Sequence, residues 1–291
     1  MKKVAVFMIF GQSNATGHGV PMQEEDYISQ PLKNVYGLNR EPNQSFDIDH
    51  LEFSGYTSFG MNLAETQDNT YSVPNQLAKA WQLKIDNGES LPDLYIIQIS
   101  IGSQGLYGMW NMNMERVLVP GVHGTARISL FPYTIHILKL LNKHFKDNEL
   151  EPDFVGMHWR GGEQETDFKV EELLSRGIKN DYIKLFTSLR ESLGYNPPLV
   201  LHRMPFEAVM LKNDPSGESL KTMHFLNDLF EELAKEIPNA TTFEPKNCPF
   251  YNENEWDFGI FRWDLIHYSG KMNTWVAEQI LNDYIDKRIS K

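Results

Sequence analysis

A short apolar run near the start of the chain, residues 4–10, ends at Gly11 and is followed by Gln12, Ser13 and Asn14. A run rich in valine, isoleucine and phenylalanine that stops at glycine is typical of a strand buried in a parallel sheet. Ser13 would then lie at the carboxyl edge of that sheet, where α/β proteins place their ligand chemistry. The stretch alone favours Ser13 as the cap of a following helix over Ser13 as a catalytic nucleophile.

Apolar runs and amphipathic periods alternate along the rest of the chain. We expect further strands at residues 34–38, 94–101, 154–159, 199–202 and 241–243, and helices at 73–87, 130–145, 178–193, 220–237 and 271–289. This order predicts the α/β class, with a central parallel sheet covered by helices on both faces. Residues 39–73 and 103–125 show no clear period and are interpreted as insertions around one site, so residues 1–291 are expected to form a single domain.

The charge and the lengths of the apolar runs disfavour several classes of partner. The net charge of −12 opposes binding to nucleic acid or to an anionic membrane surface. No apolar run approaches the roughly 18 residues needed to cross a bilayer. The run at residues 4–10 is also short for a signal peptide and lacks a cleavage site after it. The chain as given is therefore predicted to be cytoplasmic, with a signal removed before this start as the alternative.

Several other residues that could carry chemistry are better explained structurally. The single cysteine, Cys248, has no neighbouring base in the sequence, and no H-E-x-x-H metal motif is present. His158 is expected to pack inside its strand, and His18 to lie at the rim of the site. A glycosidase that uses Glu163 and Glu165 is disfavoured because residues two apart on one loop rarely face the same gap.

The ends of three expected strands, together with a segment near the end of the chain, could supply a hydrolytic site. Asp264 lies three residues before His267, a spacing that lets a carboxylate orient an imidazole whose other nitrogen takes a proton from Ser13. The glycine-rich strand ends at Gly102 and Gly162 could expose backbone N–H groups. Each such oxyanion donor is worth about 3 kcal/mol in the transition state.

These blocks resemble the SGNH-type hydrolases, specifically the carbohydrate esterase branch that includes sialate O-acetylesterases and acetylxylan esterases. The resemblance is carried by residues 11–14 with Gly17 and Gly19, residues 96–102, His158-Trp159 leading to Gly162-Glu163, and Asp264-x-x-His267. It implies a flavodoxin-like three-layer α/β/α sandwich. It also implies that Ser13 is the nucleophile, His267 the base and Asp264 its orienter, with the N–H groups of Ser13 and Gly102 as oxyanion donors.

The sequence departs from the pattern of this family at two places. Gly161 stands where the family usually has a glutamine whose side chain helps to hold the oxyanion, so Arg160, Gln164 or backbone N–H groups would have to substitute. Residues 102–105 read Gly-Ser-Gln-Gly instead of Gly-Gly-Ser/Thr, which leaves the donor open between Gly102 and Gly105. The further candidates for oxyanion or substrate binding are Gln12, Gly162, Glu163 and Arg160.

The combined pattern predicts a serine esterase that removes O-acetyl groups from a carbohydrate, either a sialic acid or a xylan-type sugar, through an acetyl-enzyme. No metal or organic cofactor is required for this chemistry. The alternative is a catalytically weak carbohydrate-binding protein on the same fold, motivated by the missing glutamine at position 161. An esterase for lipid acyl chains is less favoured because the long polar loops lack a wide apolar stripe. The sequence leaves the oligomeric state open.

Overall fold

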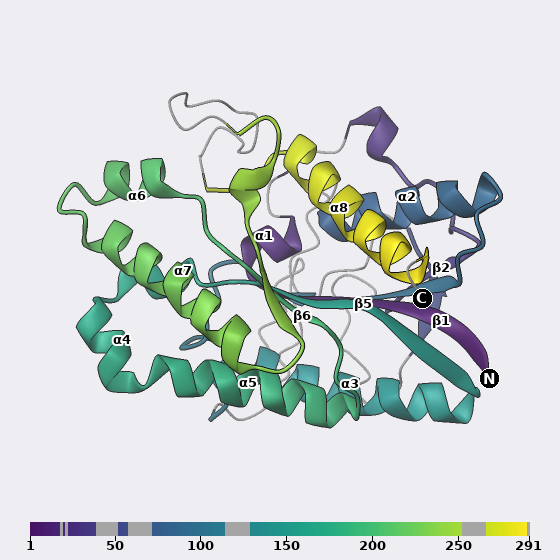
Figure 1. Ribbon diagram of the computed structural model, residues 1–291, viewed down its shortest axis with the longest axis horizontal. Helices are drawn as coiled ribbons and strands as arrows, with labels where there is room; N and C mark the ends of the chain where they lie inside the picture. Colours follow the sequence, from purple (N-terminus) through teal and green to yellow (C-terminus); the bar gives the residue numbers. More distant parts are fainter. Residues whose placement is uncertain are drawn as a thin grey trace, which may run out of the picture.

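The computed structural model describes residues 1–17, 20, 23–38, 52–57, 72–113, 129–251 and 266–289. The strands are β1 (Lys2–Gly11), β2 (Val35–Leu38), β3 (Phe53–Gly55), β4 (Asp93–Ser100), β5 (Leu150–Arg160), β6 (Leu199–His202) and β7 (Ala240–Phe243). The helices are α1 (Ser13–Thr16), α2 (Val73–Asp86), α3 (Leu130–Asp147), α4 (Val170–Arg176), α5 (Ile178–Leu193), α6 (Glu207–Asn213), α7 (Glu218–Glu236) and α8 (Gly270–Ile289). Three short 3₁₀ turns, η1 (Glu24–Asp26), η2 (Gln164–Asp167) and η3 (Pro245–Asn247), lie between them. Figure 1 shows how these elements are arranged.

The strands form one seven-stranded sheet in the order β3-β2-β4-β1-β5-β6-β7, with β1 in the middle. All neighbouring strands are parallel except β3, which runs antiparallel to β2 at the edge. From β1 the chain passes to β2 and β4 on one side, and from β5 it continues to β6 and β7 on the other. The direction of winding therefore reverses beside β1, the position where open α/β sheets hold their ligands.

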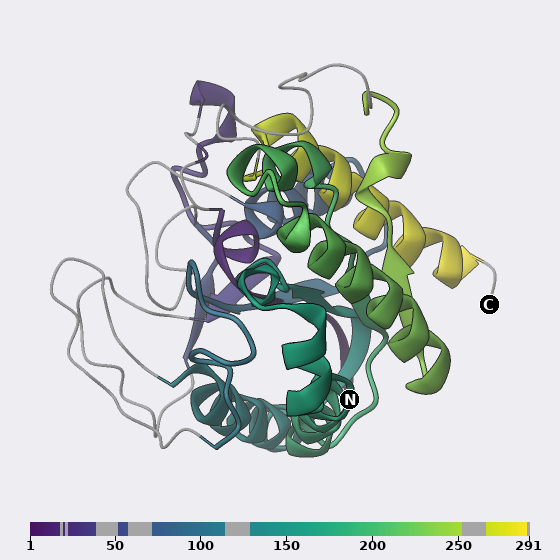
Figure 2. The same ribbon diagram turned by 90° about the vertical axis from the view of Figure 1, so that its left-hand side faces the viewer.

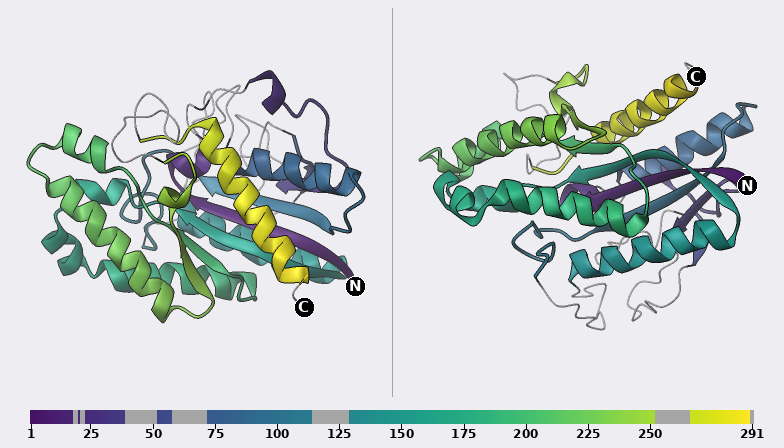
Figure 3. Two further views of the ribbon diagram at one scale, coloured as in Figure 1. Left: turned by 45° about the horizontal axis from the view of Figure 1, so that its top comes forward. Right: turned by 60° about the horizontal axis from the view of Figure 1, so that its bottom comes forward.

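Helices cover both faces of the sheet. Helices α2 and α8 pack together on one face and α3 and α5 on the other, as Figure 3 shows from two sides. Because successive side chains of a strand point to opposite faces, a strand covered on both sides must be apolar throughout. Residues 4–10 are accordingly all buried.

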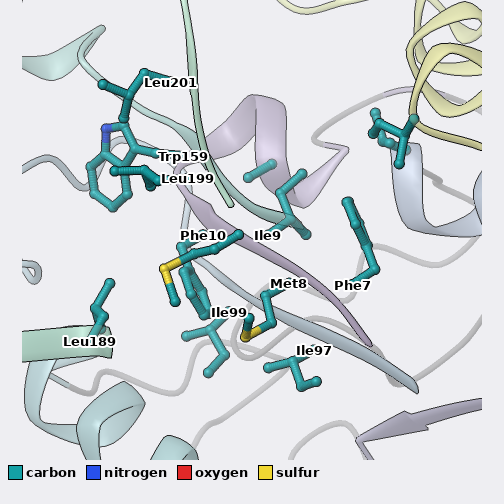
Figure 4. Packing of buried hydrophobic residues seen from close by; sticks show 14 of the residues in the cluster. Phe7, Met8, Ile9, Phe10, Ile97, Ile99, Trp159, Leu189, Leu199 and Leu201 are labelled. Atoms are coloured by element: carbon teal, nitrogen blue, oxygen red, sulfur yellow. The ribbon is translucent and has the colours of Figure 1, made fainter. Parts of the chain in front are cut away.

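The core between β1 and its neighbours shows this alternation directly. Met8 pairs with Ile97 of β4, and Phe10 pairs with Ile99. Figure 4 shows these four side chains close together, with Phe7 and Ile9 on the other side of the strand. The sheet interior thus fixes the direction and the end point of β1, and with them the position of Gly11.

The expected α/β class and three-layer architecture are confirmed, with one antiparallel edge strand added. The strand and helix ranges expected from periodicity agree closely with the observed ones, although β5 begins four residues earlier than expected, at Leu150. The short elements α4, α6 and β3 were not expected. Most of the two expected insertions, at residues 39–73 and 103–125, lies outside the described residues, and the single-domain interpretation stays a prediction. None of the described helices is both long and apolar enough to span a membrane.

Candidate active site

The carboxyl ends of β1, β4 and β5 lie at one edge of the sheet, which Figure 2 views with α1 near its middle. Gly11 is level with both Ser100 and Arg160 in the two neighbouring strands. Gly11 has a φ of +139°, and a Cβ at this position would overlap the carbonyl oxygen of Arg160. Only glycine can therefore end β1 this close to β5, and the chain then turns directly into Gln12 and Ser13.

Ser13 is the first residue of α1 and is half-buried. The N-cap of this short helix is Gln12, and no side chain caps the helix by a hydrogen bond. The interpretation of Ser13 as a helix cap is therefore wrong. Gln12 itself is buried, with 3% of its surface exposed, and its backbone N–H donates to the carbonyl oxygen of Arg160.

Side chains of β4 and α1 lock the short helix onto the sheet. The Gln98 amide donates to the carbonyl oxygen of Ala15 over 2.6 Å, and the Thr16 hydroxyl donates to Ser100 Oγ over 2.9 Å. Both contacts are buried, where hydrogen bonds are most costly to lose. They fix the turn that carries Ser13 relative to the end of β4.

Asn14 connects this turn to two distant segments. Its Nδ2 donates to Glu163 Oε1 over 2.9 Å and to the carbonyl oxygen of Ile266 over 3.1 Å. Its Oδ1 accepts the backbone N–H of Tyr268 over 3.1 Å. Ile266 and Tyr268 flank His267 in the sequence. The Asn14 side chain therefore fixes the backbone on both sides of His267 close to the turn that carries Ser13.

The loop after β4 brings glycine backbone to the same edge. Gly102 is the second residue after the end of β4 and is half-buried, whereas Gly105 is buried against the Glu165 carboxylate. Among the described residues, the backbone N–H groups of Ser13, Gly102 and Gly105 take part in no backbone hydrogen bond. These are the groups that the sequence suggested as oxyanion donors.

The end of β5 offers no side chain in place of the missing glutamine. A Cβ on Gly161 would press against the Trp159 indole, and Gly162, at φ +123°, lies against Met204. Gln164 donates to Asp167 on an exposed turn. Glu163 is the candidate from this block that contacts the turn of Ser13, through Asn14.

Arg160 points toward α8 and is 2% exposed. Its guanidinium lies 4.2 Å from the centre of the Tyr268 ring and donates to Asn273 Oδ1 over 3.5 Å. Burial lowers the pKa of Arg160, and the nearby Tyr268 and Glu163 partly oppose this shift. Through Tyr268, the arginine packs against the segment that carries His267. These contacts engage the guanidinium with Tyr268 and Asn273, so it is not positioned to replace the missing glutamine as an oxyanion donor.

Two buried histidines lie next to this arginine inside the sheet. His158 Nδ1 and His202 Nε2 are 2.9 Å apart, and desolvation lowers the pKa of His158 to about 3 and that of His202 well below its usual value. His158 is therefore a packed strand histidine, as expected. The neighbouring Arg203 pairs with Glu231 and Glu244.

Asp264 and His18 lie outside the described residues, whereas His267 is described and half-buried. Within the described ranges, no three His, Cys, Asp or Glu side chains form a possible metal-binding group. Glu163 and Glu165 contact different partners, Asn14 and the backbone of Leu106, so they do not act on one gap as a glycosidase pair would. The structure brings together the segments of Ser13, Glu163 and His267, with Gly102 at the adjoining strand end.

Sequence reasoning assigned no role to Asn14, Trp110 or Glu165. Trp110 Nε1 donates to the carbonyl oxygen of Gly11 over 3.0 Å, and Glu165 accepts the backbone N–H of Leu106. For Asn14 the sequence offered two signals: its place in the motif at residues 11–14, and a polar side chain beside a buried strand end, which needs hydrogen-bond partners. Trp110 and Glu165 act through contacts that no local pattern encodes.

No protein-family model and no curated protein sequence matches the chain. Solved structures do match. NanS has a TM-score of 0.63 at 13% identity, with 98% of both chains covered. A protein from Arabidopsis thaliana has a TM-score of 0.59 at 11% identity, with 97% of this chain and 98% of that chain covered.

A third solved structure is XAC1771, a carbohydrate acetylesterase from Xanthomonas citri. It has a TM-score of 0.52 at 12% identity over 94% of this chain and 54% of its own. The chain shares its fold with these structures, one of which is a carbohydrate acetylesterase. This agreement confirms the fold that the sequence motifs implied, and at these identities it concerns the fold alone.

Proposed function

We propose that the chain is a serine esterase that removes O-acetyl groups from a carbohydrate. The observation that carries the proposal is the position of Asn14, whose side chain bonds on both sides of His267 while its backbone adjoins Ser13. A nucleophile needs a base within hydrogen-bond reach. Because Asn14 is bonded to the segment of His267 and directly follows Ser13, it supports Ser13 as the nucleophile and His267 as its base. Asp264 is proposed to orient the histidine.

The proposed reaction has two half-reactions. Ser13 Oγ attacks the acetyl carbonyl carbon while its proton passes to His267 Nε2. The oxyanion that forms accepts hydrogen bonds from the N–H groups of Ser13 and Gly102. The sugar hydroxyl then leaves with the proton from His267, and an acetyl-enzyme remains. Water attacks this ester while its proton passes to His267, and His267 then returns the proton to Ser13 Oγ as acetate leaves. No cofactor is needed for these steps.

An acetylated sugar of the sialic acid or xylan type is the proposed substrate. The fold shared with a carbohydrate acetylesterase supports a sugar ester, and the net charge of −12 speaks against nucleic acid or an anionic membrane as partner. Comparing acetyl with octanoyl p-nitrophenyl esters tests the acyl part. A preference for octanoyl would contradict the acetyl assignment.

The central test compares acetate release by the wild-type protein and by Ser13→Ala. We expect kcat to fall at least about 10³-fold, because loss of a nucleophile removes the covalent route. Ser29→Ala, which makes the same change at an exposed position, is the matched control and should keep wild-type activity. Equal acetate release by Ser13→Ala and the wild type would show that Ser13 is not the nucleophile.

A carbohydrate-binding protein with little catalysis is the second candidate, because Gly161 supplies no side chain and Gln164 bonds elsewhere. Saturable sugar binding by a protein that no serine-directed fluorophosphonate labels would favour this function. Labelling of Ser13 together with acetate release would favour the esterase.

A further inference from the structure

The loop that follows β4, residues 101–113, reaches across the edge of the sheet without regular secondary structure. Its far end is fixed by Trp110, whose indole donates to the carbonyl oxygen of Gly11 and packs against Trp159. Its near end follows Ser100, the last residue of β4, whose Oγ accepts a hydrogen bond from the Thr16 hydroxyl of α1. The part between these anchors contains the backbone N–H groups of Gly102 and Gly105.

Glu165 contacts the middle of this loop at Gly105 and Leu106. Its side chain is fully buried, at 0% exposure, and Oε1 accepts the backbone N–H of Leu106 over 2.5 Å. A Cβ on Gly105 would overlap Oε1, so the glycine backbone lies directly on the carboxylate. The loop is therefore shaped around this one side chain, which comes from η2 after β5.

Burying this carboxylate is costly, since no described cationic side chain forms an ion pair with it. The groups that face it are Tyr107 of the loop, Tyr182 of α5 and Glu163 of its own segment. Behind Tyr107 lie Arg176 of α4, 5.0 Å from the ring, and Asp181 of α5, 3.4 Å from the hydroxyl. Desolvation raises the pKa of Glu165 to about 7, and the N–H groups of Leu106 and Tyr107 limit that rise.

We propose that Glu165 is a positioning residue for the esterase reaction, and that its Oε1 holds the loop so that the N–H groups at Gly102 and Gly105 face the site of Ser13. The inference rests on the proposed function. What matters is the hydrogen-bond acceptor: a carboxylate, a carboxylic acid and an amide can each accept the Leu106 N–H. The backbone N–H groups that donate to Glu165 stabilise its charged form, but the desolvation cost of the charge outweighs that gain.

The kinetic test uses Glu165→Ala and Glu165→Gln, with kcat counted per fluorophosphonate-reactive site. We expect Glu165→Ala to lower kcat about 10²-fold with KM little changed, because a displaced donor weakens only the transition state. Glu165→Gln keeps the acceptor and should recover at least tenfold of this loss. Glu236→Ala, on the exposed end of α7, is the control for removing a glutamate. A kcat per site within threefold of wild type in Glu165→Ala would overturn the proposal, as would failure of the glutamine to rescue.

A second pair of variants tests the contact itself. Gly105→Ala should lower kcat in the wild-type background, where its methyl meets the carboxylate, and should add little to Glu165→Ala, where the space is open. Fully additive losses in the double variant would show that the two residues act separately.

Hydrogen exchange gives a readout that needs no esterase activity. The raised pKa of Glu165 means that the closed loop favours the neutral acid. Protection of amides 105–107, corrected for intrinsic exchange, should therefore fall as pH rises from about 4.5 to 7 and then level off. Glu165→Gln should abolish this dependence. If the wild type releases no acetate, the proposed function is wrong. The exchange experiment still tests whether the hydrogen bond from Leu106 to Glu165 stabilises the loop. Unchanged protection of these amides in Glu165→Ala would show that Glu165 does not stabilise the loop.

Discussion

At the scale of single residues, the buried amide of Asn14 determines how the candidate site is assembled. Its side chain is 4% exposed, and both its donor and its acceptor atoms are used. An amide offers two N–H donors and a carbonyl oxygen in one rigid plane, which suits a junction of three chain segments.

We expect Asn14→Asp to lower kcat about 10²-fold while the protein stays folded. Aspartate retains the acceptor for the Tyr268 N–H but loses the donors to Ile266 and places a like charge next to Glu163. The measurement is acetate release together with the urea midpoint. Asn196→Asp, at an exposed position, is the control. Wild-type kcat in Asn14→Asp would show that this junction does not position His267.

At the scale of helices and strands, periodicity predicted the long elements and missed the short ones. The amphipathic helices α2, α3, α5 and α7 and the apolar strands β1 and β4 carry their own pattern, so their expected ranges agree closely with the structure. The three-residue strand β3 exists only by pairing with β2, and α4 and α6 are single short segments. Likewise, Ser13 and His267 could be selected from motifs, but the contacts of Asn14 and Glu165 depend on tertiary packing.

The pairing of β5 and β6 gives a prediction at this same scale. His158 and His202 hydrogen bond across these strands, and desolvation lowers the pKa of both. The folded state thus holds the neutral forms, so stability is present above the unfolded pKa of about 6.5 and is lost as pH falls toward 3. For His158 the loss at pH 5 is about 2 kcal/mol, and His202 shifts the stability in the same direction.

The test compares urea unfolding of the wild type and of His158→Leu/His202→Leu at pH 7.5 and pH 5. Replacing both partners by apolar side chains leaves no unpaired group. Between the two pH values, the free energy of unfolding of the double variant should fall by about 2 kcal/mol less than that of the wild type, or by a larger margin. The comparison between variants cancels other titrations, including that of Glu165, which acts in the opposite direction. Parallel losses in both proteins would exclude the pair as a source of acid sensitivity.

At the scale of the whole molecule, one apolar core joins both halves of the sheet. It includes Trp81 of α2 and Trp159 of β5, and it extends to Cys248 beyond β7. The central strand β1 contacts β4 on one side and β5 on the other, so neither half of the sheet is complete without it. Such a core predicts that the chain unfolds as one cooperative unit.

Tryptophan fluorescence and the reactivity of Cys248 should therefore report the same unfolding transition. The thiol is 4% exposed, and burial raises its pKa, so a disulfide reagent should label native protein slowly. We expect coincident urea midpoints for labelling and for fluorescence. Cys248→Ala should keep its acetate release, since the thiol has no part in the proposed reaction. Labelling at urea concentrations well below the fluorescence transition would mean that the region around β7 opens separately, and the single-domain interpretation would then be wrong.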